Sequence, residues 1–285
     1  MKDAAKTQDS CAPRRLALVL GTNEIASAIA TKLTEATFAV VMSHAPFPPV
    51  IRRRMSFHDA LFGELSQVEG VVGKRADTLL EIVRIHTDPN SVAVTEMHLS
   101  DIIVLRPLSV IVDARMQKHR APPDLSGFAR VTVGIGPGFE VGGNCHTAIE
   151  THPAQTGAIL SRGATKAADG RSRELGEAGR ERFVYSHRHG IWRTVVDIGT
   201  PVSKNMQLGR LSGTPVLAPI GGVLRGIARD GARVPEGVKL LEIDPRKRQS
   251  CWTGMDERGR AIACNAVAAI ENFILPRSRD RRVYR

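Results

Sequence analysis

The sequence predicts an α/β protein with a parallel-sheet domain, a duplicated all-β domain and a C-terminal helix. Three observations lead to this prediction: a strand, glycine turn, helix, strand order at 16–42, a repeat at an offset of 32 residues between 190 and 243, and a small-residue helical pattern at 259–274. The composition agrees with it. A chain of 285 residues, 42% of them hydrophobic, has room for about two domains with real cores.

The opening of the first domain begins with an apolar run at 16–20 that stops at Gly21, and a second apolar run follows at 38–42. Between the two runs, one face of a helical pattern collects the apolar residues Ile25, Ala28, Ile29 and Leu33. This βαβ order predicts a Rossmann-like parallel sheet at 16–156. A polar leader at 1–15 is expected to be disordered.

The glycine turn of this unit is an incomplete dinucleotide-binding motif. A complete motif has a second glycine where Asn23 stands, because the pyrophosphate approaches the backbone closely there. Glu24 adds negative charge beside the expected phosphate. We keep Gly21 as a candidate cofactor-binding residue, favour an architectural role for the turn, and do not expect NAD(P) as the cofactor.

Residues at about 44–85 are expected to form an insertion in this domain. Three prolines open it, and three consecutive arginines follow, Arg52, Arg53 and Arg54. Ser56 is placed to cap a helix, so the arginines and the free N–H groups of that helix suit a phosphate. The alternative is that the arginines form a solvated edge. The remainder is predicted as a short strand at 68–72 and a helix at 74–85.

The alternation then resumes with a strand at 91–95, a helix at 99–105 and a strand at 108–113. Asp113 ends the last of these strands, and ligands of open α/β sheets gather at the carboxyl ends of strands. Asp113 is therefore a candidate catalytic residue, and Arg115 a candidate contact for an anionic cofactor. The alternative for Asp113 is a turn cap.

The main site candidate is the stretch 131–152, which contains five glycines. It is predicted as a strand, a loop and a helix, an arrangement that presents N–H groups to an anion. Its candidate cofactor-binding residues are Gly134, Gly136, Gly138 and Phe139. Alternatively, the glycines serve a sharp turn, since glycine adopts positive φ most readily. Cys145 and His146 are candidate catalytic residues, with Cys145 either a low-pKa sulfur carrier or an inert core thiol.

The second half begins with a predicted linker or mobile loop at 157–182, and the duplicated β domain follows at 183–245. Six positions match at the offset, namely Gly190/Gly222, Arg193/Arg225, Gly199/Gly231, Val202/Val234, Leu208/Leu240 and Leu211/Ile243. Two such copies can pack together and bury apolar surface that neither copy would bury alone. A strand and helix at 246–276 are expected to pack back on the first domain, ahead of a basic tail at 277–285.

Composition limits the classes of function. The net charge of +11 permits an anionic ligand or an acidic partner, but 4% aromatic residues leave few stacking platforms, and nucleic acid is not expected. The four cysteines form no CxxC pair, so we expect neither a metal site nor a disulfide framework. With no secretory signal or membrane-length apolar run, a cytoplasmic protein without a membrane partner is expected.

Several motifs together resemble the accessory (maturation) family of selenium-dependent molybdenum hydroxylases, whose first domain is related to xanthine dehydrogenase maturation factors. They are GTNEIASAIATKL, PPVIRRRMSF, VDARMQKH, GIGPGF with CHTAIET, APIGGVLRGIARDG and IDPRKRQSCWTGMDERGRAIA. The resemblance implies an accessory protein that binds a molybdopterin-type cofactor and serves an apo-molybdenum enzyme or another protein complex. Homo-oligomerisation is left open.

The passage at 218–243 also resembles half of a biotinyl/lipoyl-type barrel-sandwich hybrid domain. The hairpin at 211–214 has no lysine, so no covalent biotin or lipoate is expected. The chain departs from the pattern of the molybdenum hydroxylase accessory family at the GTNE turn, at Ser43 and His44 after the second strand, and at His152 and Pro153. The alternative functions are a noncatalytic assembly or docking subunit and a divergent NAD(P)- or flavin-binding oxidoreductase.

Overall fold

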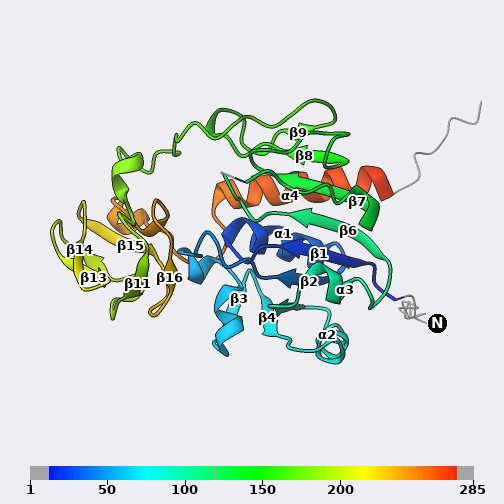
Figure 1. The fold of residues 1–285 in the computed structure, drawn as a ribbon, viewed down its shortest axis with the longest axis horizontal. Coiled ribbons are helices and arrows are strands. Elements are labelled where there is room, and N and C mark those ends of the chain that lie inside the picture. The colour runs from blue at the N-terminus through cyan, green and yellow to red at the C-terminus, as the bar shows by residue number, and fades with distance from the viewer. Residues whose placement is uncertain (1–12, 119, 275–285) are drawn as a thin grey trace, which may run out of the picture.

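The computed structural model describes residues 13–118 and 120–274. The basic tail at 277–285 and most of the predicted leader at 1–15 lie outside the described residues. The chain forms a large mixed sheet, two smaller antiparallel sheets and a long C-terminal helix (Figure 1). This confirms the α/β class that the sequence predicts, with additional β structure after the first sheet.

The large sheet has nine strands in the order β3-β4-β5-β2-β1-β6-β7-β8-β9. All neighbours from β4 to β8 are parallel, and the edge strands β3 and β9 pair antiparallel. The strands are β1 (Leu16–Leu20), β2 (Ala39–Ser43), β3 (Ser66–Val68), β4 (Val71–Arg75), β5 (Ser91–Thr95), β6 (Leu108–Asp113), β7 (Ala129–Ile135), β8 (Thr147–Ile149) and β9 (Ile159–Leu160).

Strands β1, β2 and β5 are buried along their whole length, as continuous apolar runs in the centre of a parallel sheet should be. The chain continues from β1 to β2, which lies beside β1 on one side, and β6 later lies beside β1 on the other side. The strand order therefore reverses between β1 and β6, where open α/β sheets commonly bind ligands.

Within the described residues, four α-helices accompany the sheets, α1 (Glu24–Glu35), α2 (Leu79–Ile85), α3 (Leu99–Ile102) and α4 (Glu257–Ile274). The helix predicted at 259–274 is confirmed as α4, which packs against α1 and also contacts β7 and β8 (Figure 1). Its alanines explain the close approach, since Ala263 and Ala266 are fully buried in the same core as Ala30 of α1.

Several predicted elements are wrong in detail. The helix predicted after the loop of 131–152 is instead β8, where Thr147 and Ile149 favour the strand that pairs with β7. The single strand predicted at 68–72 is a hairpin, because Glu69 and Gly70 adopt positive φ and reverse the chain. The helix predicted after Ser56 is replaced by short 3₁₀ turns.

Helices α2 and α3 are shorter than the sequence predicts. Helix α2 begins at Leu79 rather than near 74, because Thr78 and Glu81 form a capping box. The 3₁₀ turns lie at Arg53–Met55, His58–Phe62, Ser126–Phe128, Pro153–Gln155, Arg180–Arg182 and Lys247–Gln249. The segment at about 44–85, expected as an insertion, contributes β3 and β4 to the large sheet.

Residues 183–244, which we call the β module, form two four-stranded antiparallel sheets at one end of the large sheet (Figure 1). Their orders are β10-β17-β15-β12 and β14-β13-β11-β16. The strands are β10 (Phe183–Tyr185), β11 (Gly190–Arg193), β12 (Pro201–Val202), β13 (Gln207–Leu211), β14 (Thr214–Leu217), β15 (Gly222–Ile227), β16 (Arg233–Val234) and β17 (Lys239–Asp244).

The repeat found in the sequence corresponds to two interlocked copies of three strands. Strands β11, β12 and β13 of the first copy match β15, β16 and β17 of the second. The middle strand is exchanged, because β12 pairs with β15 and β16 pairs with β11. Each sheet therefore contains strands of both copies, and the two copies share one apolar core.

A candidate anion-binding cleft

The three consecutive arginines connect the large-sheet region to the β module. Arg52 Nε and Nη2 donate to both carboxylate oxygens of Glu242 in β17, at 2.6 and 3.1 Å. Arg53 Nη1 donates to Asp59 at 2.6 Å, and its Nε donates to the carbonyl oxygen of Ile227 at 3.1 Å. These contacts are structural, and they leave few donors for a ligand.

The neighbouring backbone is also joined to the β module. The carbonyl oxygen of Ile51 accepts a hydrogen bond from the N–H of Ile227 in β15, at 2.8 Å. The Ile51 side chain is buried in the core of the β module. A side chain on Gly226 would lie 3.0 Å from the Ile51 oxygen, so a residue without a Cβ permits this contact.

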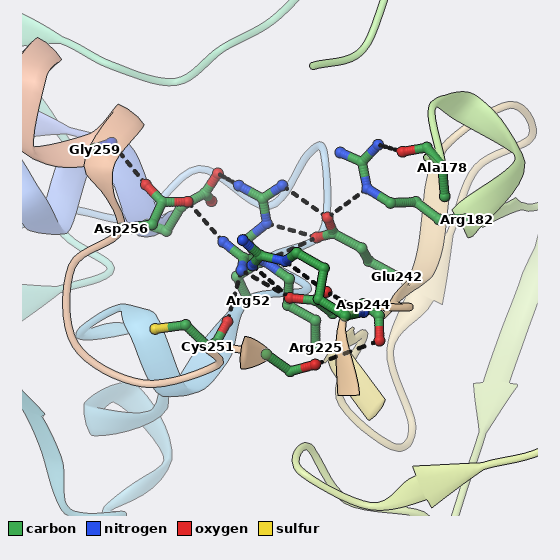
Figure 2. A network of polar contacts seen from close by, with 12 residues as sticks. Arg52, Ala178, Arg182, Arg225, Glu242, Asp244, Cys251, Asp256 and Gly259 are labelled. Carbon is green, nitrogen blue, oxygen red and sulfur yellow. Dashed lines mark hydrogen bonds and ion pairs between the residues drawn. The ribbon is translucent and has the colours of Figure 1, made fainter. Parts of the chain in front are cut away.

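Glu242 is the centre of a buried ion-pair network (Figure 2). Its side chain has no exposed surface, and Arg182 Nε donates to it at 3.0 Å in addition to Arg52. Burial alone raises the pKa of a carboxyl group, but Arg52, Arg225 and Arg182 outweigh burial and hold the pKa of Glu242 below its ordinary value. Glu242 is therefore charged and compensated.

Arg225 extends this network to the start of α4 (Figure 2). Its Nη2 donates to Asp256 at 2.6 Å, and its Nη1 donates to the carbonyl oxygen of Cys251 at 2.6 Å. Asp256 in turn accepts from the N–H of Gly259 at 2.7 Å, as a cap of the helix. Helix α4, the large sheet and the β module are thus held in one arrangement by charge-assisted hydrogen bonds.

A cleft with a volume of about 530 Å³ lies beside this network. Its walls come from segments that follow the carboxyl ends of four strands of the large sheet, namely Asn23 and Glu24 after β1, 47–52 after β2, 116–118 after β6 and Pro137 after β7. Further walls come from residues 150–153 and 166–173, from Arg258 of α4, and from β10 and β17 of the β module. This location is where an α/β sheet presents a ligand site.

Lys118, Lys239 and Arg258 line the cleft and are not compensated as the arginines of the network are. Within the ranges 13–118 and 120–274, no carboxylate oxygen lies within 4.0 Å of the charged nitrogens of Lys118, Lys239 or Arg258. Lys239 Nζ lies 3.6 Å from the centre of the Phe183 ring. Arg258 donates to the carbonyl oxygen of Thr151 at 3.4 Å.

The electrostatics of these cations favour an anion. Removal from solvent, Arg52 and Lys118 lower the pKa of Lys239 to about 7. Removal from solvent and Arg258 lower the pKa of Lys118, and removal from solvent and Arg52 lower the pKa of Arg258. Because the cations repel one another across the cleft, a bound dianion would stabilise all three.

Two carboxylates of the cleft, Glu150 and Asp169, hold its walls in place. Glu150 is buried and accepts hydrogen bonds from the backbone N–H groups of Thr151, His152 and Lys166, at 2.7, 2.7 and 2.8 Å. His152 Nδ1 accepts from the N–H of Ala154, so its Nε2 carries the hydrogen that is donated to Asp169 at 3.0 Å. These bonds join residues 150–152 to the segment 166–169.

The Gly21 turn is filled by the chain itself. Asn23 Oδ1 accepts from the N–H groups of Ile25 and Ala26, both at 3.0 Å, and these are amides that a phosphate would use at this helix terminus. Asn23 Nδ2 donates to the carbonyl oxygen of Ala114 at 2.7 Å. Gly21 is buried, and a side chain there would meet the same oxygen at 3.0 Å.

Asp113 and Arg115 form a closed pair. Arg115 Nε and Nη2 donate to the two oxygens of Asp113, at 2.9 and 2.5 Å. The hydrogen bond with Asp113 raises the pKa of Arg115, although burial opposes this. Neither residue lines the cleft. Of the sequence-predicted cofactor contacts, Arg52 reaches the cleft, and its strongest hydrogen bonds go to Glu242.

The glycine loop after β7 is packed rather than open. A side chain on Gly134 would lie 2.1 Å from the Phe139 ring, which is buried against Cys145 and Ala148. The N–H of Gly136 donates to the carbonyl oxygen of Ile149, and that of Phe139 donates to Thr165 Oγ1. These amides are therefore already bonded, and Gly138 packs beside Pro122.

Cys145 and His146 do not form a reactive pair. Cys145 is buried, and burial raises the pKa of its thiol to about 11, opposite to the low pKa expected of a sulfur carrier. His146 Nδ1 accepts from the N–H of Thr132 at 3.0 Å, and its ring packs against Phe273. Both residues serve the packing around β7 and β8.

The sequence patterns assign no role to Lys118, Lys239 or Arg258, which all line the cleft. One signal for Lys239 is present in the sequence: the run KLLEID of β17 places Lys239, Glu242 and Asp244 between apolar residues of one strand. Arg258 lies in the first turn of α4, where a cation opposes the helix dipole.

Comparisons with known proteins give one relative of similar sequence. No family model matches the chain. The chain is 29% identical over 257 residues to the uncharacterized protein YqeB of Escherichia coli (strain K12). The match covers 90% of this chain and 47% of YqeB, so the chain spans about half the length of that relative.

A solved structure gives a partial similarity. The product-bound ectoine utilization protein EutE (DoeB) from Ruegeria pomeroyi is 21% identical, with a TM-score of 0.21. The match covers 30% of this chain and 27% of that chain, and it does not extend to the whole fold. Among the residues described, no helix is both long and apolar enough to cross a membrane, and no group of three or more His, Cys, Asp or Glu side chains is placed to hold a metal ion.

Proposed function

We propose that this chain is an accessory protein for a molybdenum-dependent hydroxylase, and that its cleft binds the phosphate end of a molybdopterin-type cofactor. The observation that carries the proposal is the group Lys118, Lys239 and Arg258, three cations without carboxylate partners among the described residues of a cleft at the carboxyl ends of parallel strands. A phosphate dianion supplies the charge that this group lacks. The motif series in the sequence supplies the context of a molybdenum enzyme.

The proposal extends to the fold. We infer that the large sheet is a Rossmann-like domain, supported by the reversal of strand order between β1 and β6. We infer that the β module is a barrel-sandwich hybrid, supported by the exchange of β12 and β16 between its two copies. In this arrangement the cofactor lies between a ligand-binding sheet and a docking module, and the chain transfers it to a client enzyme rather than transforming it.

Binding is tested by calorimetric titration of the purified protein with molybdopterin. The double variant Lys239→Gln/Arg258→Gln should weaken binding by about 100-fold, because each charge-assisted contact contributes about 1.5–3 kcal/mol. The matched control is Arg193→Gln/Arg210→Gln, which removes two charges from neighbouring positions of β11 and β13, outside the cleft. Equal affinities of the two double variants would refute the proposed site.

Delivery is tested separately with an apo-molybdenum hydroxylase. The protein loaded with molybdopterin should restore hydroxylase activity faster than the same concentration of free cofactor. The Lys239→Gln/Arg258→Gln variant should give no advantage over free cofactor. Tight binding without accelerated reconstitution would contradict the accessory role while leaving the binding site in place.

A further inference from the structure

The cleft is larger than a phosphate requires, and part of its lining is apolar. Its volume of about 530 Å³ lies in the range of pockets that hold whole cofactors. The apolar lining includes the segment 47–51, Met116 and Pro137. A ligand that fills this space has an anionic group for the cations and an uncharged part for these residues.

Phe47 is the notable residue of the apolar lining. Its side chain is 45% exposed although it borders a cleft. The rings of Phe183 and Tyr185, which also line the cleft, face cations, since Lys239 and Arg182 lie over Phe183, and Arg180 lies over Tyr185. In the described part of the chain, no aromatic or cationic group stacks on Phe47.

The backbone that carries Phe47 is held at several points. The N–H of His44 donates to the carbonyl oxygen of Thr95, and the carbonyl oxygen of Ile51 accepts from β15, each at 2.8 Å. Between these anchors, Gln117 Nε2 donates to the carbonyl oxygen of Phe47 at 3.0 Å. The ring is therefore presented at the cleft by a fixed segment.

Gln117 also connects the backbone of Phe47 to the segment that carries Lys118. It precedes Lys118 directly in the segment after β6, and both residues line the cleft. A phosphate held by Lys118 thus brings the group attached to it toward the segment of Phe47. A planar ring there would cover an exposed apolar surface and stack on an aromatic face.

Resting on the proposed function, we propose that Phe47 determines specificity in the cleft: it selects a phosphate ester that carries a planar heterocycle by stacking on that heterocycle. The cations bind the phosphate of many ligands. Phe47 distinguishes ligands with a ring from ligands without one. Stacking on Phe47 can therefore be tested separately from binding of the phosphate by the cations, with a different set of variants for each contact.

The test compares three probes by fluorescence and calorimetry on the full chain: neopterin monophosphate, neopterin and glycerol 3-phosphate. Wild-type protein should bind neopterin monophosphate more tightly than either of the other two. Phe47→Ala should weaken binding of neopterin monophosphate about tenfold, within the range of one ring–aromatic stacking contact, and leave glycerol 3-phosphate unchanged. Phe47→Leu should behave like Phe47→Ala, and Phe47→Trp should retain binding.

The matched control is Phe128→Ala, because Phe128 is 48% exposed and lies outside the cleft. It should leave the affinity for all three probes unchanged. The inference is overturned if Phe47→Ala weakens both phosphate esters equally, or neither, or if wild-type protein binds both with the same affinity. If wild-type protein binds no phosphate ester, the proposed function fails as well, so the two failures are distinguishable.

Discussion

Two groups of cations meet where the β module joins the large sheet, and they differ in their partners. Arg52, Arg182 and Arg225 surround the buried Glu242 with ion pairs. Lys118, Lys239 and Arg258 face the adjoining cleft, and within the described residues no carboxylate pairs with them. Cations that are paired with a buried carboxylate stabilise the fold, whereas cations without such a partner are available to bind an anionic ligand.

The largest expected effect concerns the compensated group. Glu242→Gln should lower the free energy of unfolding by about 3–5 kcal/mol, because removing the shared carboxylate leaves buried guanidinium groups uncompensated. Urea denaturation measures this change. Glu236→Gln, at an exposed position of the same module, is the control and should change stability little. A loss below about 1 kcal/mol in Glu242→Gln would show that the network is not needed for stability.

The second prediction concerns the uncompensated group. Lys239→Met should weaken binding of a phosphate ester about tenfold, through loss of one charge-assisted contact, without lowering the stability of the ligand-free protein. Calorimetry and urea denaturation of the same preparations measure both quantities. Lys204→Met, an exposed lysine outside the cleft, is the control. A strongly destabilised Lys239→Met protein would show that Lys239 stabilises the fold, and it would contradict the distinction between the two groups of cations.

The third prediction follows from the titration of Lys239. Since the pKa of Lys239 is lowered to about 7 and a bound phosphate favours its charged form, the affinity for a phosphate ester should fall as the pH rises above 7. Between pH 7 and 9 the phosphate remains dianionic, so it does not cause this decrease. Calorimetry across this range measures the slope. Lys239→Met should bind weakly with a much smaller slope, and an unchanged slope would assign the titration to another group.

The smallest effect should come from the counterpart of Arg225 in the first copy of the repeat. Arg193 pairs with Asp230 at 3.3 Å, and both side chains are more than half exposed. Arg193→Gln should therefore change the free energy of unfolding by less than about 1 kcal/mol. Arg225→Gln, measured in parallel, should be much more destabilising because Arg225 is buried among Asp256, Asp244 and Glu242. Similar losses in both would remove the distinction between the two copies.

Much of the fold follows from the sequence, because periodicity and burial are local properties. The run at 16–20, the helix after Gly21 and the Ala-rich α4 each carry their pattern within a few residues. The register of the repeat also predicts which strands correspond. The sequence does not predict β8 as a strand, because three residues are too few to show a period and its pairing with β7 is a tertiary contact.

The candidate site was harder to predict, because compensation of charge depends on residues far apart in the sequence. Arg52 is conspicuous beside two other arginines, yet its partner Glu242 lies 190 residues away. Lys239 gives a weaker local signal and lies in the cleft without a described carboxylate partner. The glycines at 134–138 were interpreted through their backbone freedom, whereas Phe139 fills the space beside Gly134. Local patterns thus identify charged residues and glycines, but only the fold determines which charges lack a partner and which glycines face open space.

The most direct test of the central claim is an experimental structure of the protein with bound molybdopterin. The phosphate should lie within hydrogen-bond distance of Lys239 and Arg258, with the ring system against Phe47. The Glu242 network should be the same with and without ligand. A phosphate at the N–H groups of Ile25 and Ala26, or in the loop at 134–139, would contradict the account.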